Sequence, residues 1–115
     1  MMEISSDVIR GYNDTMILFI LGEAPSYGYE ISKKIKQLSK EKYLIKETTL
    51  YSAFTRMEKN GFIESFVSDD AEGNGKKRTY YRITELGKQY YNAKCEEWKL
   101  TKDVVENFIR DNGIV

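Results

Sequence analysis

The spacing of apolar residues changes at Gly61, and this change limits what the chain can fold into. Before Gly61 the apolar residues recur at helical spacing, as Leu50, Ala53, Phe54 and Met57. After it, residues 62–67 (FIESFV) and 78–83 (RTYYRI) are typical of β-strands, and Asn74-Gly75 between them suits a tight hairpin turn. The sequence therefore predicts a helix from around Thr48 to Gly61, followed directly by a β-hairpin.

Three further helices are predicted around this unit. The first spans residues 7–22, and the second has Ser26 as its N-cap and one apolar face. The last is capped by Thr84 and reaches about Arg110. The order helix, helix, helix, hairpin, helix predicts a mainly α fold with a β-hairpin wing, which is a winged helix-turn-helix with a long C-terminal helix.

Charge is spread unevenly along the chain, although the 115 residues carry no net charge. Residues 32–59 contain eight Lys or Arg and three acidic residues, so this segment has an excess of five positive charges. A basic side on a neutral domain predicts a polyanionic partner. A Lys-rich helix that is simply solvated is the alternative explanation.

The chain has no histidine and a single cysteine, Cys95. Without histidine the chain cannot form a Ser-His-Asp or Cys-His nucleophile or use a His metal ligand. A thiolate metal site needs more than one cysteine. We therefore expect no enzyme activity, no catalytic residue, no metal site and no cofactor.

One cysteine suits a reducing compartment, no segment resembles a signal peptide, and the longest apolar run, residues 16–21, is too short for a membrane span. The expected location is the cytoplasm.

The predicted 48–59 helix has polar side chains opposite and beside its apolar stripe. These are Thr48, Thr49, Tyr51, Ser52, Thr55, Arg56 and Lys59. Such side chains reach phosphate oxygens and base edges in the DNA major groove, which is wide enough for a helix. Arg56 suits a guanine, because its planar fork can donate two hydrogen bonds to that base, and the hydroxyls suit phosphates. An ordinary solvated face with hydroxyls as caps is the alternative.

The predicted hairpin carries three adjacent cations beside its Gly-rich tip: Lys76, Lys77 and Arg78. A hairpin of this kind forms a wing that lies along a phosphate backbone or enters a minor groove. Acidic residues at 69, 70 and 72 lie on the other arm, and a charged loop without a partner is the alternative. Tyr29 and Lys33, in the second predicted helix, complete the predicted DNA-binding set.

Several segments resemble the PadR family of bacterial transcriptional regulators. They are residues 27–31 (YGYEI), 49–64 (TLYSAFTRMEKNGFIE), 76–88 (KKRTYYRITELGK) and the later Trp98. The resemblance covers nearly the whole chain and implies a homodimeric winged-helix transcription factor. The short C-terminal region resembles the small subgroup that includes repressors sensing drug-like compounds. We accordingly expect a DNA-binding domain at residues 1–83 and a C-terminal dimerisation helix at 84–115, in one compact unit.

The last predicted helix carries a stripe that can form a coiled-coil-like seam. Its members fall at steps of 4, 3, 3, 4 and 3 residues, as Tyr91, Cys95, Trp98, Thr101, Val105 and Phe108. One monomer has little left to bury this stripe, so we expect a two-fold dimer through it, supported by Val8 and Ile9 of the first helix. Such a dimer places two recognition helices about one DNA turn apart, on a palindromic site.

Trp98 is the only tryptophan and lies in the middle of this seam. Two copies that face each other across a dimer would form a flat aromatic clamp for planar or cationic small molecules. The residues expected to line this ligand pocket are Trp98, Tyr91, Cys95, Asp14, Thr15 and Lys102. Plain interface packing of Trp98 is the alternative.

These features together predict a sequence-specific DNA-binding transcriptional regulator. We expect a repressor that binds a palindromic operator in double-stranded DNA as a homodimer and responds to a small-molecule effector. The alternative is a winged-helix adaptor that uses the same face to bind a protein. Protein interfaces favour aromatic and apolar anchors, and on that face only Tyr51 is of this kind.

Overall fold

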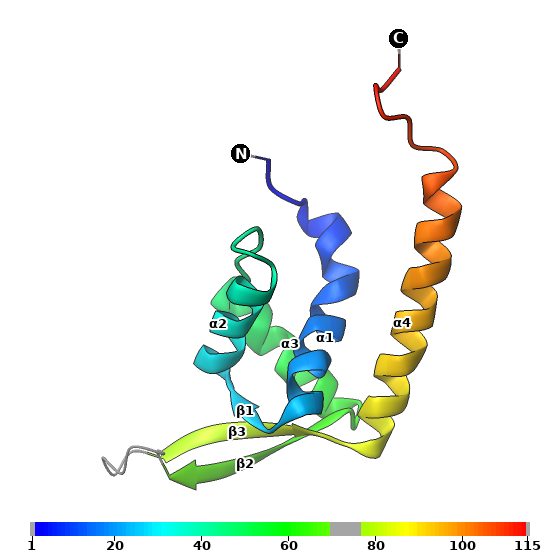
Figure 1. Ribbon diagram of the computed structural model, residues 1–115. Coiled ribbons are helices and arrows are strands. Elements are labelled where there is room, and N and C mark those ends of the chain that lie inside the picture. Colours follow the sequence, from blue (N-terminus) through cyan, green and yellow to red (C-terminus); the bar gives the residue numbers. More distant parts are fainter. Residues whose placement is uncertain (1, 70–76, 115) are drawn as a thin grey trace.

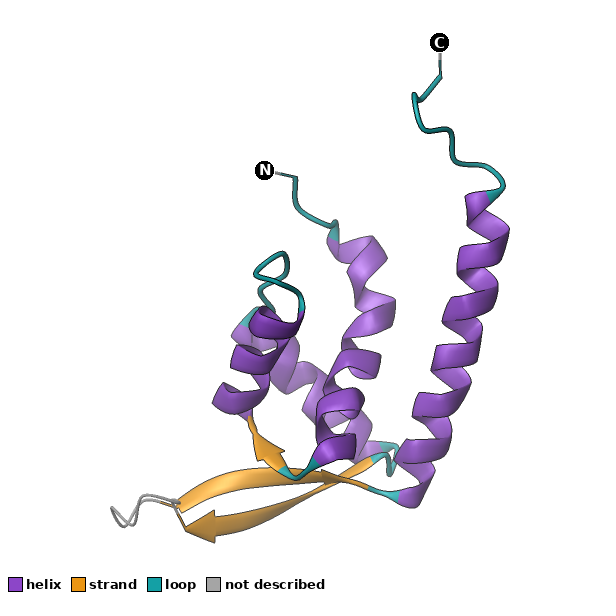
Figure 2. Ribbon diagram, viewed as in Figure 1, coloured by secondary structure: helices purple, strands orange, loops and turns teal. Residues whose placement is uncertain are grey.

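The structure is a computed structural model that describes residues 2–69 and 77–114. The elements in these residues are α1 (Ser6–Glu23), β1 (Ser26–Tyr27), α2 (Gly28–Leu38), α3 (Glu47–Lys59), β2 (Ile63–Asp69), β3 (Lys77–Ile83) and α4 (Glu85–Glu106). Figures 1 and 2 show α1, α2 and α3 gathered on one side of a long twisted β2–β3 hairpin, with α4 standing beside α1. The predicted winged helix-turn-helix with a long C-terminal helix is confirmed.

The core lies where α1, α2 and α3 meet the hairpin. Its buried apolar residues include Ile17, Leu18 and Ile20 of α1, Ile31 of α2, Leu50, Ala53, Phe54 and Met57 of α3, and Ile63 of β2. The Phe54 ring stacks on Tyr81 of β3 with the ring centroids 4.2 Å apart. The apolar stripe predicted for the third helix is therefore confirmed as its buried face, and it anchors α3 to the wing.

The sheet has the strand order β1-β3-β2, and both pairings are antiparallel. β2 and β3 pair along their full length, from Ile63 opposite Ile83 to Asp69 opposite Lys77. The two residues of β1 pair with the other edge of β3. Both predicted hairpin strands are thus confirmed, and a short third strand ties the start of α2 to the wing.

Ser26 does not have the predicted N-cap role. It lies in β1 opposite Tyr81, and the residue that precedes α2 is Tyr27, which makes no side-chain cap. Pairing with β3 keeps this backbone extended, with φ −126° at Tyr27. The buried Ser26 hydroxyl instead donates a hydrogen bond to the Glu30 carboxylate of α2.

Two predicted helix boundaries are confirmed. Gly61 follows α3 with φ +78°, a left-handed conformation that glycine adopts without steric cost. Thr84 caps α4, because its hydroxyl accepts a hydrogen bond from the Gly87 N–H at 3.0 Å. The predicted Asn-Gly turn and the first predicted wing cation fall in residues 74–76, outside the described residues.

The predicted end of the last helix is wrong. α4 ends at Glu106 instead of near Arg110. The N–H groups of Asn107 and Phe108 bond to carbonyls three residues earlier, which tightens the chain into turns and stops the α-helix. Phe108 therefore lies beyond the helix and is 80% exposed. The stripe predicted on this helix ends at Val105.

α4 extends the molecule beyond its core. The structure measures 61 × 32 × 21 Å with a radius of gyration of 16.4 Å, whereas a compact chain of this length has about 13 Å. The start of α4 is anchored, since Tyr90 stacks on Phe62 with centroids 4.1 Å apart. Its far end points away from the hairpin (Figure 1). None of the described helices is both long and apolar enough to span a membrane.

Candidate nucleic-acid interface

One face of α3 is exposed opposite the buried stripe. Thr48, Ser52, Thr55 and Lys59 are all exposed and share this face, because residues three or four apart lie on the same side of a helix. We call these four residues the hydroxyl face. Its small side chains allow a close approach to the α3 backbone, which suits a helix that enters a major groove.

The first two turns of α2 carry an exposed aromatic ring and a cation. Tyr29 is exposed, and the Lys33 Nζ lies 5.7 Å from the centroid of its ring. The neighbouring Lys34 is instead paired with Glu30 at 3.9 Å. Of these two adjacent lysines, Lys33 is the one that extends over an exposed ring beside the start of α2.

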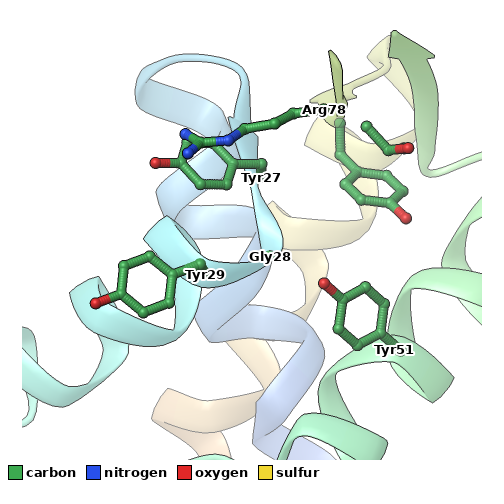
Figure 3. Close-up of a pocket in the computed structure, with 7 residues that line it drawn as sticks. Tyr27, Gly28, Tyr29, Tyr51 and Arg78 are labelled. Carbon is green, nitrogen blue, oxygen red and sulfur yellow. The ribbon is translucent and has the colours of Figure 1, made fainter. Parts of the chain in front are cut away.

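A cavity of about 340 Å³ lies between the start of α2, α3 and β3. Its lining residues are Tyr27, Gly28, Tyr29, Tyr51, Arg78, Thr79 and Tyr81. Figure 3 shows the Arg78 side chain lying over the Tyr27 ring and the Tyr51 hydroxyl turned toward Gly28. The Arg78 guanidinium carbon is 4.4 Å from the Tyr27 ring centroid. We call this cavity the α2 pocket.

Gly28 permits the close approach of Tyr51 to α2. A Cβ at residue 28 would overlap the Tyr51 hydroxyl and lie 2.9 Å from its Cζ. A side chain at residue 28 would therefore push the Tyr51 ring out of its place. Because Tyr51 also sits next to the hydroxyl face on α3, this contact fixes the α2 pocket relative to that face.

The α2 pocket has the chemistry of an anion site. The first N–H groups of α2 have no partner within the helix and carry its positive dipole end. Arg78 adds a permanent positive charge, and Tyr51 adds a hydroxyl. Burial, and to a lesser extent Glu58, raises the pKa of Tyr81, so its hydroxyl stays protonated at neutral pH.

Thr49 and Arg56 lie on a different flank of α3 from Tyr51. Thr49 lines a groove of about 770 Å³ with residues of α1 that include Asn13. The Arg56 guanidinium forms an ion pair with Asp14 of α1. The structure therefore brings Thr49 and Arg56 toward α1 and not toward the α2 pocket.

The described wing cations differ in their surroundings. Lys77 is exposed at the start of β3, opposite Asp69 of β2. Arg78 is half-buried and stacks on Tyr27. The predicted wing set thus divides into Arg78, which belongs to the α2 pocket, and Lys77, which extends the positive charge along the hairpin.

The residues predicted for a ligand pocket lie on α1 and α4. Trp98 is 47% exposed and packs edge-on against Tyr12, with centroids 5.5 Å apart. The Tyr91 ring lies 6.5 Å from Phe19, and the side-chain hydrogen bond with Cys95 raises the pKa of Tyr91. Tyr91 and Trp98 therefore make contacts with α1 of the same chain.

The remaining residues of that pocket are already engaged or lie at its side. Asp14 binds Arg56, and Lys102 lies 3.7 Å from Glu106 on its own helix. Thr15 is half-buried beside Asp14. Trp98 lines neither the α2 pocket nor the groove beside Thr49.

The predicted dimer residues are mostly accessible in the single chain. Val8, Val105 and Phe108 are exposed, Ile9 is half-buried, and the Thr101 hydroxyl donates to the Glu97 carbonyl at 2.8 Å. Leu100 and Val104 of α4 are also exposed. α4 therefore presents apolar side chains that one chain leaves in water.

Sequence reasoning missed Tyr27, Gly28, Thr79 and Tyr81 as members of a site. The signal that could have found two of them is the Tyr-Gly-Tyr triplet at 27–29, because a glycine between aromatic residues indicates a close backbone contact. Within the described residues, no group of three or more His, Cys, Asp or Glu side chains could hold a metal ion.

The sequence model of the PadR-like transcriptional regulator family matches residues 17–93. The chain belongs to this family. A solved structure of a transcriptional regulator from Clostridium thermocellum is 58% identical, with 91% of this chain and 100% of that chain covered and a TM-score of 0.84. A PadR family transcription regulator from Clostridium difficile is 37% identical over 84% of this chain and 97% of its own, with a TM-score of 0.71.

A further relative, an uncharacterized protein from Lysinibacillus sphaericus, is 42% identical over 106 residues, which are 92% of this chain and 95% of that protein. The PadR-like family assignment agrees with the resemblance found in the sequence. It makes the chain a transcriptional regulator, which implies regulation through DNA and indicates a protein that is not an enzyme.

Proposed function

We propose that this PadR-like protein is a repressor that binds a palindromic operator as a homodimer. The observation that carries the proposal is the position of Tyr51, which lines the α2 pocket and adjoins the hydroxyl face of α3. An anion site and a base-reading helix face are thereby held side by side. This is the arrangement that a protein needs to bind a phosphate and a groove edge at once.

Each part of this surface has a distinct role in the proposal. The α2 pocket binds a backbone phosphate through the α2 N–H groups, Arg78 and the Tyr51 hydroxyl. The hydroxyl face enters the major groove, where Thr48 and Ser52 near the start of α3 approach base edges, a different role from the phosphate contacts that the sequence predicts for them. Lys33 and Lys59 bind flanking phosphates. Protein partners favour apolar anchors, which the hydroxyl face lacks.

The test is binding to DNA from upstream of the protein's own gene against scrambled DNA, by fluorescence anisotropy across a salt series. We expect a preference of about a thousandfold or more at physiological salt, with a steep salt slope. The proposal would be contradicted if the protein bound weakly and without preference, both to this DNA and to fragments selected from a random DNA pool. That result would favour an adaptor that binds a protein.

The wing contributes charge rather than sequence reading, so Lys77→Ala should weaken binding to operator and random DNA alike. One lost phosphate contact lowers the slope of log K against log salt by about 0.9. Lys99→Ala is the matched control, since Lys99 is exposed on α4 and not on α3, which carries the hydroxyl face. An unchanged slope in Lys77→Ala would remove this wing residue from the interface.

The proposed dimer forms through α4 with support from α1, and residues 84–115 act as the dimerisation segment. The exposed Val105 and Val8 side chains and the elongated shape of the single chain support this proposal. A second copy would remove these apolar side chains from water, and a two-fold axis would present two hydroxyl faces to one side of the DNA.

We also propose that an effector binds at this interface beside Trp98, which one chain leaves half-exposed. A ligand shifts the regulator only if it binds one dimer geometry better than another, and so changes the separation of the two α3 helices.

Stacking of a planar aromatic cation on the Trp98 indole should quench the intrinsic tryptophan fluorescence, because the chain has no other tryptophan. The measurement is a fluorescence titration alongside calorimetry of the same ligand. Trp98→Phe should lose the signal and weaken binding. A ligand that binds by calorimetry but leaves the Trp98 emission unchanged would place the effector site elsewhere.

A further inference from the structure

An ion pair joins α3 to α1 beside the hydroxyl face. The Arg56 Nη2 contacts the Asp14 Oδ1, and among the ion pairs within residues 2–69 and 77–114 this is the one that links two helices. The Asp14 side chain is 13% exposed and that of Arg56 is 50% exposed. Water screens a mostly buried carboxylate less than an exposed one, so Asp14 holds its partner more firmly than a surface acid would.

Arg56 lies on the flank of α3 that faces α1. It follows Thr49 by seven residues, about two helical turns, and Thr49 lines the groove shared with Asn13 of α1. Tyr51 occupies the opposite flank, beside α2. Arg56 also belongs to the last third of α3, whereas the recognition helix of a helix-turn-helix contacts base edges with its N-terminal residues.

A second cation, Lys94 of α4, interacts electrostatically with the same carboxylate. The pKa of Lys94 is raised mainly because its ammonium donates a hydrogen bond to Glu97 at 3.0 Å. The negative charge of Asp14 raises this pKa further, by a smaller amount. Asp14 therefore interacts with a cation from α3 at contact distance and with one from α4 through its charge.

We propose that Asp14 is a positioning residue that holds the Arg56 guanidinium away from DNA. The inference rests on the proposed DNA-binding function. An arginine free to move beside the hydroxyl face would reach a phosphate on any duplex, and such contacts raise affinity without adding sequence information. Asp14 thus leaves base reading to the hydroxyl face and keeps non-specific binding weak. In this proposal Arg56 stays paired with Asp14. It does not contact a guanine, which is the role that the sequence predicts for it.

Asp14→Asn tests this role, because asparagine keeps the size of the side chain and removes its charge. Affinity for a random duplex is measured by fluorescence anisotropy between 50 and 200 mM salt. One added phosphate contact steepens the slope of log K against log salt by about 0.9. Between 50 and 200 mM salt, the variant should therefore lose roughly 3- to 4-fold more affinity than the wild type loses. Affinity for the operator should rise by a similar factor, because a phosphate contact forms on any duplex.

Further variants separate release of Arg56 from a general effect of charge. Arg56→Gln should keep the wild-type slope, and Asp14→Asn combined with Arg56→Gln should return to it. Asp7→Asn is the matched control, because it makes the same charge change on α1 at a side chain that is 90% exposed and 3.8 Å from Arg10. It should leave the slope unchanged. Thermal unfolding checks that each variant folds.

A wild-type slope in folded Asp14→Asn would overturn the proposal. So would a loss of operator selectivity in Arg56→Gln, which would identify Arg56 as a direct DNA contact with Asp14 as its support. If Asp14→Asn does not fold, Arg56→Gln alone decides between these outcomes. Failure of the proposed function is distinct, because the wild-type protein itself would then bind weakly and show no preference between operator and random duplexes.

Discussion

Replacing Gly87 with alanine should destabilise the fold by about 3 kcal/mol, the upper part of the usual cost of overpacking. A Cβ on Gly87 would overlap the Phe62 carbonyl oxygen and lie 2.8 Å from the Ile83 Cγ1. The carbonyl cannot move easily, because it accepts the Thr84 N–H at 3.1 Å where the wing turns into α4. Alanine is favoured over glycine inside a helix by about 1 kcal/mol, which the backbone overlap outweighs.

Chemical denaturation of Gly87→Ala against wild type measures this loss. Gly11→Ala and Gly22→Ala are matched controls, since both glycines lie in α1 and a Cβ on either meets no atom within 4 Å. Both controls should be neutral or more stable by up to about 1 kcal/mol. A Gly87→Ala protein as stable as wild type would show that α4 can lift off Phe62 at little cost.

Val105→Glu should convert the proposed dimer to a monomer and reduce operator affinity by about a hundredfold or more. A monomer binds one half-site of the operator, whereas a dimer binds both half-sites at once. Val105 is 47% exposed in the single chain, so glutamate is tolerated there by the monomer. In the proposed seam the same position is buried, and two unpaired carboxylates would face each other across the two-fold axis.

Sedimentation and anisotropy on the same samples test this expectation. Leu86→Glu is the control, because Leu86 lies on α4 outside the stripe of Trp98, Thr101 and Val105 and is 49% exposed. It should leave both mass and affinity near wild type. A Val105→Glu protein that remains dimeric would move the interface to another part of the chain.

Local patterns predicted most of the fold. Four features each depend on residues within a few positions of one another. They are the buried stripe of α3 with Phe54 and Met57, the stop at Gly61, the two hairpin strands and the Thr84 cap. Helix and strand periods are properties of neighbouring residues, so the sequence is sufficient to read them. The exposed hydroxyl face follows from the same reading, as the side opposite the buried stripe.

Contacts between distant residues could not be predicted in this way. Ser26 forms a strand because Tyr81, far along the chain, offers an edge to pair with. Gly28 and Tyr51 meet across two helices, and Arg56 is drawn toward α1 by Asp14. Periodicity therefore determined which residues face the core and which face water. Tertiary packing alone decided the partner of each polar side chain, because an ion pair or a hydrogen bond depends on a distance that only the folded chain sets.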